Sequence, residues 1–420
     1  MRHIARFLAF PLAAVLAVAS CGLPSPGGGV QQPTGPIRIG LLAPITGTTA
    51  ASGTDMLNGW NLYWKVNGIK IGAREVQTFH EDTGGDPTVA LTKARLLIEQ
   101  RQVHFILGPL LASEGLALAD YIKGQGTPWF LPVVSADDLT QRQRIPNMLR
   151  VAGWSSSQPH HPFGEYAYEQ GYRKIVTICS DYAFGHEVCG GFSHTFSDKG
   201  GQIVAQLWNP LGTPDFSSYM TQIRGITADA VFALQVGADS PRFVRQWNEF
   251  GLKAKFPLLG GEVLLDQSLL RSMGPEAEGL ISAGHFAEGR QAKATQEYVD
   301  LYLKEYNQLP SYYASALYAA AGWIAKAIQQ SGGNVEDPKK LLEAVKSQSL
   351  DDSALGPMKL DDYGNPISNT YIRRVERRPD GKLWNVVVKT YEKVSQFWNY
   401  KPEDFLKQPV YSRDYQGLKK

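Results

Sequence analysis

This sequence of 420 residues has almost no excess of either positive or negative charge. Its 42 Lys and Arg residues nearly balance its 40 Asp and Glu residues, so the formal net charge is only +2. A chain this close to neutral has no general electrostatic attraction for nucleic acid or for an anionic membrane face. We therefore expect no nucleic-acid partner.

Enzyme signatures are missing as well. The sequence has no Gly-x-Ser-x-Gly elbow, no Walker loop and no Gly-x-Gly-x-x-Gly fingerprint. His80-Glu81 and His186-Glu187 each begin like a zinc-protease helix, but Gly84 and Gly190 stand where the second histidine is required. His160-His161 has no acidic or cysteine neighbour beside it, and we expect it in a solvated loop. The sequence thus predicts no enzyme, no metal site and no cofactor.

The one apolar run near the start is too short for a membrane span, which needs about 20 apolar residues. Arg2 and Arg6 precede an apolar stretch from Phe7 to Val18, a pattern typical of a secretory signal peptide over residues 1–20. The run ends in Val-Ala-Ser-Cys21, which resembles the bacterial lipobox. We therefore expect a lipid on Cys21, a membrane-anchored lipoprotein and an extracytoplasmic location in the periplasm or at the cell surface. Ordinary signal cleavage near the same place is the alternative.

Residues 21–36 are rich in Gly and Pro and have too little apolar surface to fold, so they predict a flexible lipidated tether. The remainder, about 380 residues from Ile37, exceeds what one core usually serves, so two lobes are expected. Only three cysteines are present, and two of them, Cys179 and Cys189, would face an oxidising compartment. A disulfide between these two is expected.

Short apolar runs alternate with amphipathic stretches along the chain, which predicts parallel sheets covered by helices on both faces. The first series has strands at residues 37–42, 76–79, 105–107 and 129–132, with helices between them. The alternation of strands and helices begins again with strands at 174–179, 203–207, 230–234 and 257–259. The fold class predicted is α/β with two doubly wound lobes.

Further helices are expected at 292–305 and 312–330, followed by two strands at 372–375 and 384–388 that flank the turn Arg378-Pro-Asp-Gly381. Residues 396–420 are polar and aromatic with little periodicity. They form a C-terminal extension to which no role can be assigned.

Several short motifs in a fixed order carry a family resemblance from Ile37 to about Gly364. They are Gly40-Leu-Leu-Ala-Pro-Ile-Thr-Gly47, Glu81-Asp-Thr-Gly-Gly-Asp-Pro87, Gly108-Pro109, Pro132-Val-Val-Ser-Ala-Asp-Asp-Leu-Thr140, Asp181-Tyr-Ala-Phe-Gly185, Asp215-Phe216 and Ala277-Glu-Gly279. By these motifs the chain resembles the periplasmic branched-chain amino-acid-binding family. The resemblance implies a type I periplasmic binding protein, in which two Rossmann-like lobes joined by three hinge crossings close on a ligand. The lobes would be 37–153 with 285–361 and 154–284 with 362–395.

The resemblance also implies a set of ligand-binding residues. Ser135 matches the position whose hydroxyl and amide grip the ligand, and Val133 would offer its carbonyl to an ammonium group. Phe184 matches an aromatic side chain that closes over the ligand. Glu262 matches the carboxylate that pairs with the ligand's ammonium, a contact that gains strength when lobe closure expels water.

Three positions depart from the family pattern. Ala112 replaces a hydroxyl that helps hold a carboxylate, although Ser113 beside it can substitute. Ser52 stands where the family has a larger aromatic wall, and Trp154 lies at the first hinge crossing. These changes reshape the side-chain pocket.

The predicted function is capture of a hydrophobic or branched-chain amino acid by a monomer that delivers it to an ATP-driven (ABC-type) membrane permease. An aromatic or aliphatic carboxylate without an amine is an alternative ligand, which Trp154, Phe184 and Ala112 favour. Glu262 disfavours it. A sensor module whose closure signals to a partner is the alternative role, because fold alone does not decide between them.

Overall fold

The computed structural model describes residues 35–419. The predicted signal peptide, the lipidation site Cys21 and nearly all of the tether lie outside the described residues, as does Lys420. No helix within 35–419 is both long and apolar enough to cross a membrane.

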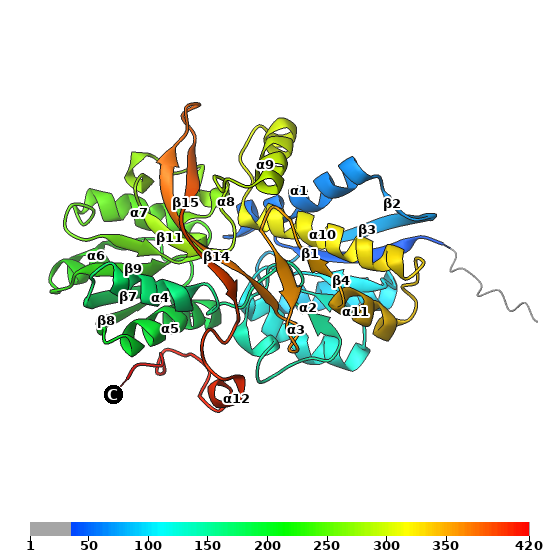
Figure 1. The fold of residues 1–420 in the computed structure, drawn as a ribbon, viewed down its shortest axis with the longest axis horizontal. Helices are drawn as coiled ribbons and strands as arrows, with labels where there is room; N and C mark the ends of the chain where they lie inside the picture. Colours follow the sequence, from blue (N-terminus) through cyan, green and yellow to red (C-terminus); the bar gives the residue numbers. More distant parts are fainter. Residues whose placement is uncertain (1–34, 420) are drawn as a thin grey trace, which may run out of the picture. The chain divides into compact units, whose positions relative to one another are not determined.

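The first of two sheets has six strands in the order β2-β3-β1-β4-β5-β6, and we call it and its helices lobe 1. Its strands are β1 (Ile37–Ala43), β2 (Lys70–Ile71), β3 (Arg74–Asp82), β4 (Phe105–Leu107), β5 (Trp129–Phe130) and β6 (Met148–Leu149). Its helices are α1 (Ala50–Asn67), α2 (Pro87–Arg95) with the π-turn η1 (Leu96–Gln100), α3 (Ala112–Gln125), α9 (Lys293–Tyr306), α10 (Tyr312–Gln330) and α11 (Pro338–Lys346). Helix α10 runs beside α1 on the right of Figure 1.

The second sheet has the order β12-β13-β14-β11-β10-β9-β7-β8, and β15 pairs with β14. We call this sheet with α4 to α8 lobe 2, drawn mainly in green on the left of Figure 1. Its strands are β7 (Lys174–Ser180), β8 (Gln202–Asn209), β9 (Ala230–Leu234), β10 (Leu258–Gly260), β11 (Ile281–Gly284), β12 (Ser349–Leu350), β13 (Met358–Leu360), β14 (Pro366–Arg377) and β15 (Leu383–Val394). Its helices are α4 (His160–Glu169), α5 (Ala183–Asp198), α6 (Ser217–Arg224), α7 (Asp239–Glu249) and α8 (Gln267–Leu270), with 3-10 turns at η3 (Glu262–Leu265) and η4 (Pro275–Ala277).

Each lobe starts with a strand whose following helix packs directly on the strand's end, and a glycine permits this approach in both. A Cβ on Gly53 of α1 would lie 1.6 Å from the Pro44 carbonyl oxygen, and a Cβ on Gly185 of α5 would lie 1.8 Å from that of Ser180. No larger residue fits at either position. The carboxyl ends of the strands and the helix N-termini are thereby brought together. Sheets of α/β proteins bind their ligands at this edge.

The chain passes three times between the two sheets: after β6, after β11 and in the stretch from α11 through β12 and β13 to β14, whose short strands β12 and β13 extend the second sheet. Buried amides tie the first and third passages together. The Gln158 Nε2 group donates to the carbonyl oxygens of Pro366 and Val394, each at 2.8 Å, and the Asn365 Nδ2 group donates to Gln158 Oε1 at 2.9 Å. The first passage is therefore hydrogen-bonded to the start of β14 and the end of β15. The residue boundaries proposed for the lobes stay a prediction.

The predicted two-lobed α/β architecture is confirmed, and all eight strands named from the first two series are present. The elements β2, β6, β11, β12, β13, α8 and α11 were not predicted. The expected solvated loop at His160-His161 is wrong, because these residues form the first turn of α4 and both are fully buried. Cys179 at the end of β7 and Cys189 in α5 are joined by a disulfide with 6.5 Å between their Cα atoms.

The C-terminal extension ends in a small aromatic cluster around α12 (Pro402–Phe405). Phe397, Phe405 and Tyr411 form its buried centre. Figure 1 shows this segment below lobe 2, next to the helices α4 and α5.

Candidate functional site

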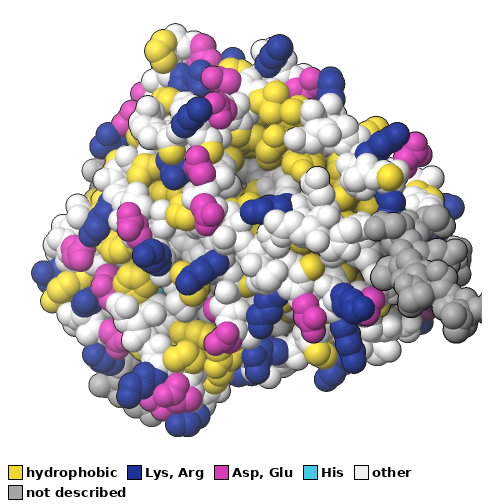
Figure 2. All heavy atoms as spheres, turned by 45° about the vertical axis from the view of Figure 1, so that its right-hand side comes forward, with side chains coloured by type: hydrophobic (Ala, Val, Ile, Leu, Met, Phe, Trp, Pro, Cys, Tyr) yellow, Lys and Arg dark blue, Asp and Glu magenta, His cyan; other side chains and the backbone are white. Residues whose placement is uncertain are grey.

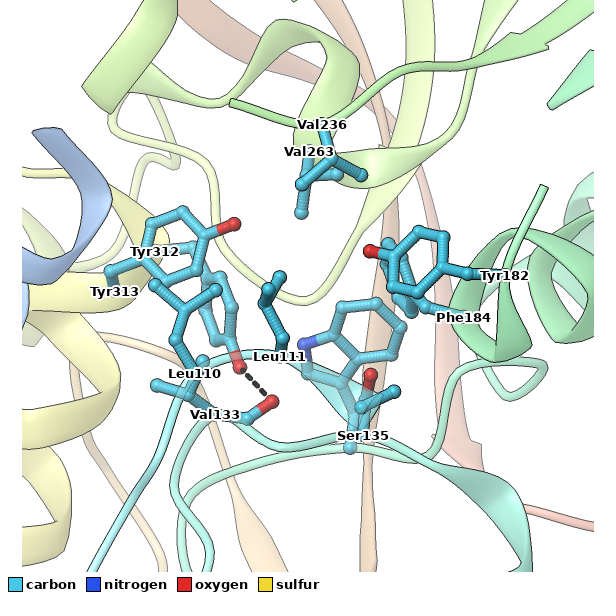
Figure 3. A pocket seen from close by; sticks show the side chains of 12 residues that line it. Leu110, Leu111, Val133, Ser135, Tyr182, Phe184, Val236, Val263, Tyr312 and Tyr313 are labelled. Carbon is cyan, nitrogen blue, oxygen red and sulfur yellow. Dashed lines mark hydrogen bonds between the residues drawn. The ribbon is translucent and has the colours of Figure 1, made fainter. Parts of the chain in front are cut away.

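A small cavity of about 20 Å³ lies where the strand ends of the two lobes meet (Figure 3). That is about the space of one water molecule and well below the volume of an open small-molecule site. Twelve residues line it: Leu110, Leu111, Ala112, Val133, Ser135, Trp154, Tyr182, Phe184, Val236, Val263, Tyr312 and Tyr313. None of these twelve is charged, so the site is built from apolar walls and neutral polar groups.

Both lobes contribute to the lining. Lobe 1 supplies the start of α3, the loop after β5 that carries Val133 and Ser135, and the start of α10. Lobe 2 supplies the start of α5, the loop after β9 and the turn η3. Trp154 comes from the first hinge passage. A ligand in the cavity therefore touches both lobes and the hinge.

Aromatic rings form the largest wall of the cavity. The Trp154 ring lies 5.9 Å from the rings of Phe184 and Tyr312 between centroids, in tilted arrangements. Tilted contacts of this kind are favourable for aromatic quadrupoles. Such rings present an apolar wall of the kind that packs against aromatic or branched apolar groups.

Neutral donors face the cavity from its lobe 1 side. The indole Nε1 of Trp154 is buried and has no hydrogen-bond partner among residues 35–419. The Ser156 hydroxyl donates to the Ser135 carbonyl oxygen at 2.9 Å and lies 3.0 Å from the Ser135 hydroxyl, which positions that side chain. Ala112 opens the 14-residue helix α3, whose first amides carry the partial positive charge of a helix N-terminus. Together these groups suit an anionic oxygen.

Three tyrosines add hydroxyl groups. Burial raises the pKa of Tyr182, Tyr312 and Tyr313, so each remains a neutral phenol. The Tyr312 hydroxyl donates to the Pro132 carbonyl oxygen at 3.0 Å and is 3.5 Å from that of Val133, the contact drawn in Figure 3. Figure 3 shows the hydroxyls of Tyr182 and Tyr313 pointing into the cavity from opposite sides.

Glu262 is not part of the lining, although its neighbour Val263 is. The carboxylate is fully buried and accepts hydrogen bonds from the Nδ1 and backbone N–H groups of His285 at 2.9 and 3.1 Å. Arg373 lies 3.6 Å from the same carboxylate. Burial alone would raise the pKa of Glu262, but the charges of His285 and Arg373 outweigh burial and lower it. The negative charge is thus matched inside the protein.

Four of the seven residues expected at the ligand therefore meet at the cavity, namely Val133, Ser135, Trp154 and Phe184. Ser52 and Ser113 do not line it. The Ser52 hydroxyl lies 3.1 Å from that of Ser268, while Ser113 is half-buried in the first turn of α3.

The three tyrosines were missed by sequence reasoning. Tyr182 had a usable signal, since it stands in the same motif as Phe184 at the start of α5. Tyr312 and Tyr313 open a helix predicted at the correct position, but nothing in its pattern separates a cavity-lining aromatic residue from a core one.

A pair of buried carboxyl groups, Asp137 and Glu187, joins the two lobes. Glu187 of α5 accepts a hydrogen bond from the backbone N–H of Asp137 at 3.1 Å, and the Ser157 N–H donates to the Asp137 carboxylate at 3.1 Å. One oxygen of each carboxyl group is buried without a partner among the described residues. Burial raises the pKa of Asp137 to about 6 and that of Glu187 well above its usual range, and the charge of Asp137 adds to the rise at Glu187.

Comparisons with known proteins agree with this architecture. A family model described as periplasmic binding protein matches residues 36–382. An ABC transporter substrate-binding protein from Sphaerobacter thermophilus is similar in structure with a TM-score of 0.81 and 34% identity, covering 86% of this chain and 99% of its own.

Two further relatives differ in the ligand their names mention. A solute-binding protein of an ABC transporter from Rhodopseudomonas palustris BisB5, solved with 3,4-dihydroxybenzoic acid, gives a TM-score of 0.81 at 27% identity, over 86% of this chain and 98% of that one. The Leu/Ile/Val-binding protein homolog 6 of Brucella melitensis is 27% identical over 363 residues, 85% of this chain and 92% of the relative.

Proposed function

This chain belongs to the periplasmic binding protein family, and from that we propose that it is the solute-binding component of an ABC importer whose ligand is an aromatic carboxylate without an amine. The recognised resemblance to the branched-chain amino-acid-binding proteins holds for the family and the fold. Relatives of this kind bind and deliver substrates to transporters and do not convert them. Members of the family work outside the cytoplasm.

The choice of ligand rests on the hydrogen bonds and ion pair that the Glu262 carboxylate makes. Its carboxylate is already matched by His285 and Arg373, and no acidic side chain is among the twelve that line the cavity. An ammonium group placed there would lose its hydration without gaining a counter-charge, which costs several kcal/mol. An amino acid is therefore disfavoured relative to the same acid without its amine.

A carboxylate is favoured by the groups that do face the cavity. The N-terminus of α3 provides partial positive charge, and Trp154 and Ser135 provide neutral donors. The rings of Trp154 and Phe184 supply a wall for an aromatic body. The R. palustris neighbour solved with 3,4-dihydroxybenzoic acid supports this ligand class.

A branched-chain amino acid is the second candidate. The Brucella relative named as a Leu/Ile/Val-binding protein homolog favours it, and the Val133 carbonyl stays at the cavity for an ammonium group. This candidate requires Glu262 to leave His285 and face the ligand.

A thermal-shift screen tests the proposal. A ligand that binds only the native state stabilises it by about 2.7 kcal/mol at a hundredfold excess over its Kd. We expect benzoate-type acids to raise the melting temperature and leucine, isoleucine, valine and phenylalanine to leave it unchanged. A response to the amino acids alone would favour the second candidate. Loss of uptake of the identified acid on deleting the protein, with uptake restored by returning it, separates an importer component from a sensor.

We also propose that Cys21 carries the lipid that holds the protein at the membrane, on the strength of the Val-Ala-Ser-Cys21 motif. Cys21→Ser should release the protein into the soluble fraction or leave it unprocessed. Mature Cys21→Ser protein that still sediments with membranes would contradict the assignment.

A further inference from the structure

We propose that the C-terminal segment, residues 395–419, is a latch that holds the two lobes together and restrains the opening of the cavity between them. The segment continues directly from β15 of lobe 2 and lies beyond residue 382, where the match to the periplasmic binding protein family model ends. Figure 1 shows it in red, running from β15 down to α12 and on toward α5. Capture of a ligand by two lobes does not itself require this segment.

A ligand reaches the cavity only if the lobes move apart. The space inside the lining is about 20 Å³, about that of one water molecule and well below the volume of an open small-molecule site. Of the lining residues, Ser135 lies on the loop between β5 and β6 of lobe 1, and Phe184 lies at the start of α5 in lobe 2. Any contact that ties this loop to α5 therefore opposes opening.

Arg142 ties the C-terminal segment to lobe 1. It lies on the same loop as Ser135, and its Nε and Nη2 groups donate to the Gln408 carbonyl oxygen at 3.0 and 2.8 Å. The Nη2 group also donates to the Phe405 carbonyl oxygen at 3.1 Å. The Asp138 carboxylate accepts from Nη1 at 2.9 Å and orients the guanidinium group. Hydrogen bonds from a charged donor are stronger than those between neutral groups, so this anchor resists separation.

The residues that follow hold the segment on α5 of lobe 2. The Tyr411 hydroxyl lies 2.7 Å from His194 Nδ1, and the Tyr411 ring packs against Gly190. Near the start of α5, Gln416 Nε2 donates to the His186 carbonyl oxygen at 3.1 Å. The segment thus contacts the helix that carries Phe184, as well as the loop that carries Ser135.

The anchors on the two lobes are close together along the chain. Gln408, which Arg142 holds, is only three residues before Tyr411, which α5 holds. Three residues of fully extended chain span at most about 11 Å. A wide separation of the loop from α5 therefore breaks one of the two anchors, and the free energy of these contacts opposes opening.

Hydrogen exchange of the ligand-free, full-length mature protein tests the latch at a site away from the segment. The Tyr312 amide of lobe 1 donates to the Asp266 carboxylate of lobe 2 at 2.9 Å, so it loses this acceptor when the lobes part. The Ala320 amide lies in the middle of the same helix α10, is bonded within the helix and reports unfolding. Faster exchange at Tyr312 alone therefore measures opening of the lobes.

Arg142→Ala removes the anchor on lobe 1. It should speed exchange of the Tyr312 amide at least about tenfold, as for the loss of hydrogen bonds from a charged donor, and leave the Ala320 amide unchanged. Arg142→Lys keeps the charge without the planar fork and should have a smaller effect. Exchange at Tyr312 that does not change in Arg142→Ala would overturn the inference, as would an equal acceleration at Tyr312 and Ala320.

Arg144→Ala is the matched control, because it removes the same charge from the same loop. The Arg144 guanidinium lies over the Tyr363 ring, 4.5 Å from its centroid, and within residues 35–419 it makes no hydrogen bond to the C-terminal segment. The substitution should change neither exchange rate, and an acceleration equal to that of Arg142→Ala would contradict the latch. The measurement needs no ligand, so its outcome is independent of the ligand class proposed for the cavity.

Discussion

At the scale of single residues, the chemistry of the site depends on which charges are matched within the protein. Glu262, His285 and Arg373 form a buried cluster beside the cavity in which the carboxylate is held by the other two side chains. A buried charge that loses its partner is costly, so this cluster contributes to stability and not to ligand contact.

Glu262→Gln should therefore destabilise the ligand-free protein. Removing one member of a buried ion pair typically costs about 3 to 5 kcal/mol, since it leaves Arg373 with only neutral partners. Chemical denaturation of the ligand-free protein measures the loss. Glu278→Gln is the control, because Glu278 pairs with Arg377 at the surface and such pairs contribute about 0 to 1 kcal/mol. Equal effects of the two substitutions would contradict the account.

The Asp137 and Glu187 pair predicts a specific pH dependence of stability. Burial raises the pKa of Asp137 to about 6 and that of Glu187 further, so the folded state binds these protons more tightly than the unfolded state. Their contribution to stability is complete below about pH 4 and is lost as the pH rises through 6. Arg150 and Ser157 oppose the shift of Asp137, while Asp138 adds to it.

Glu187→Gln should flatten this decline by removing the neighbouring negative charge. The free energy of unfolding, measured by denaturant titration between pH 4 and pH 8, should fall more steeply in the wild type than in the variant, by up to about 3 kcal/mol over the range. Parallel curves for the two proteins would show that the pair does not titrate in this range.

Part of the site was predictable because its residues follow strands directly. Val133, Ser135 and Phe184 sit in motifs at strand ends, and all strand ends of a parallel sheet meet at one edge. The environment of Glu262 was not predictable. Its partners His285 and Arg373 lie 23 and 111 residues further along the chain, on elements whose pairing no local pattern specifies.

At the scale of elements, the C-terminal segment of residues 395–419 connects the two lobes. On lobe 1 it receives hydrogen bonds from Thr140, whose hydroxyl is 2.9 Å from Gln396 Oε1, and from Arg142, which donates to the Gln408 carbonyl at 2.8 Å. On lobe 2 the Tyr411 hydroxyl lies 3.2 Å from His161 and 2.7 Å from His194. The segment thus explains why His161 is buried.

Tyr411→Ala should be strongly destabilising. Its ring packs against Gly190, where an added Cβ would lie 2.4 Å from it, and truncating a buried aromatic residue costs about 3 to 5 kcal/mol. Tyr415→Ala is the control, because Tyr415 is only half-buried in the same segment. Thermal unfolding of both variants measures the difference, and comparable melting temperatures would contradict the role given to Tyr411.

Helices and strands were predictable where an amphipathic pattern repeated over a long enough stretch of sequence to be distinctive. Helix α10 was expected over 312–330 and spans Tyr312–Gln330, and a Ser311 hydroxyl that accepts from the Ala314 N–H fixes its start. The strands β14 and β15 extend beyond their predicted cores, because their ends are held by pairing with each other and with β11 and β13. The C-terminal segment has no such period and is ordered by tertiary contacts alone.

At the scale of the whole molecule, the described residues show the lobes in contact. The Ala238 N–H donates to the Thr48 carbonyl at 3.2 Å, and Arg271, the residue after α8, pairs with Asp55 of α1. On the face drawn in Figure 2, basic and acidic side chains are interspersed, in keeping with the near-neutral net charge. Closure around the cavity removes water and strengthens every polar contact inside it. An unmatched ligand charge is most heavily disfavoured in this closed state.

The most direct test of the ligand assignment is calorimetric titration with pairs of acids that differ only by an α-ammonium group. The pairs are 3-phenylpropanoate with phenylalanine and 4-methylpentanoate with leucine. We predict that the amine-free member of the aromatic pair binds at least about a hundredfold more tightly, the equivalent of roughly 3 kcal/mol for an ammonium without a counter-charge. Tighter binding of phenylalanine or leucine than of its amine-free partner would contradict the account and place Glu262 at the ligand.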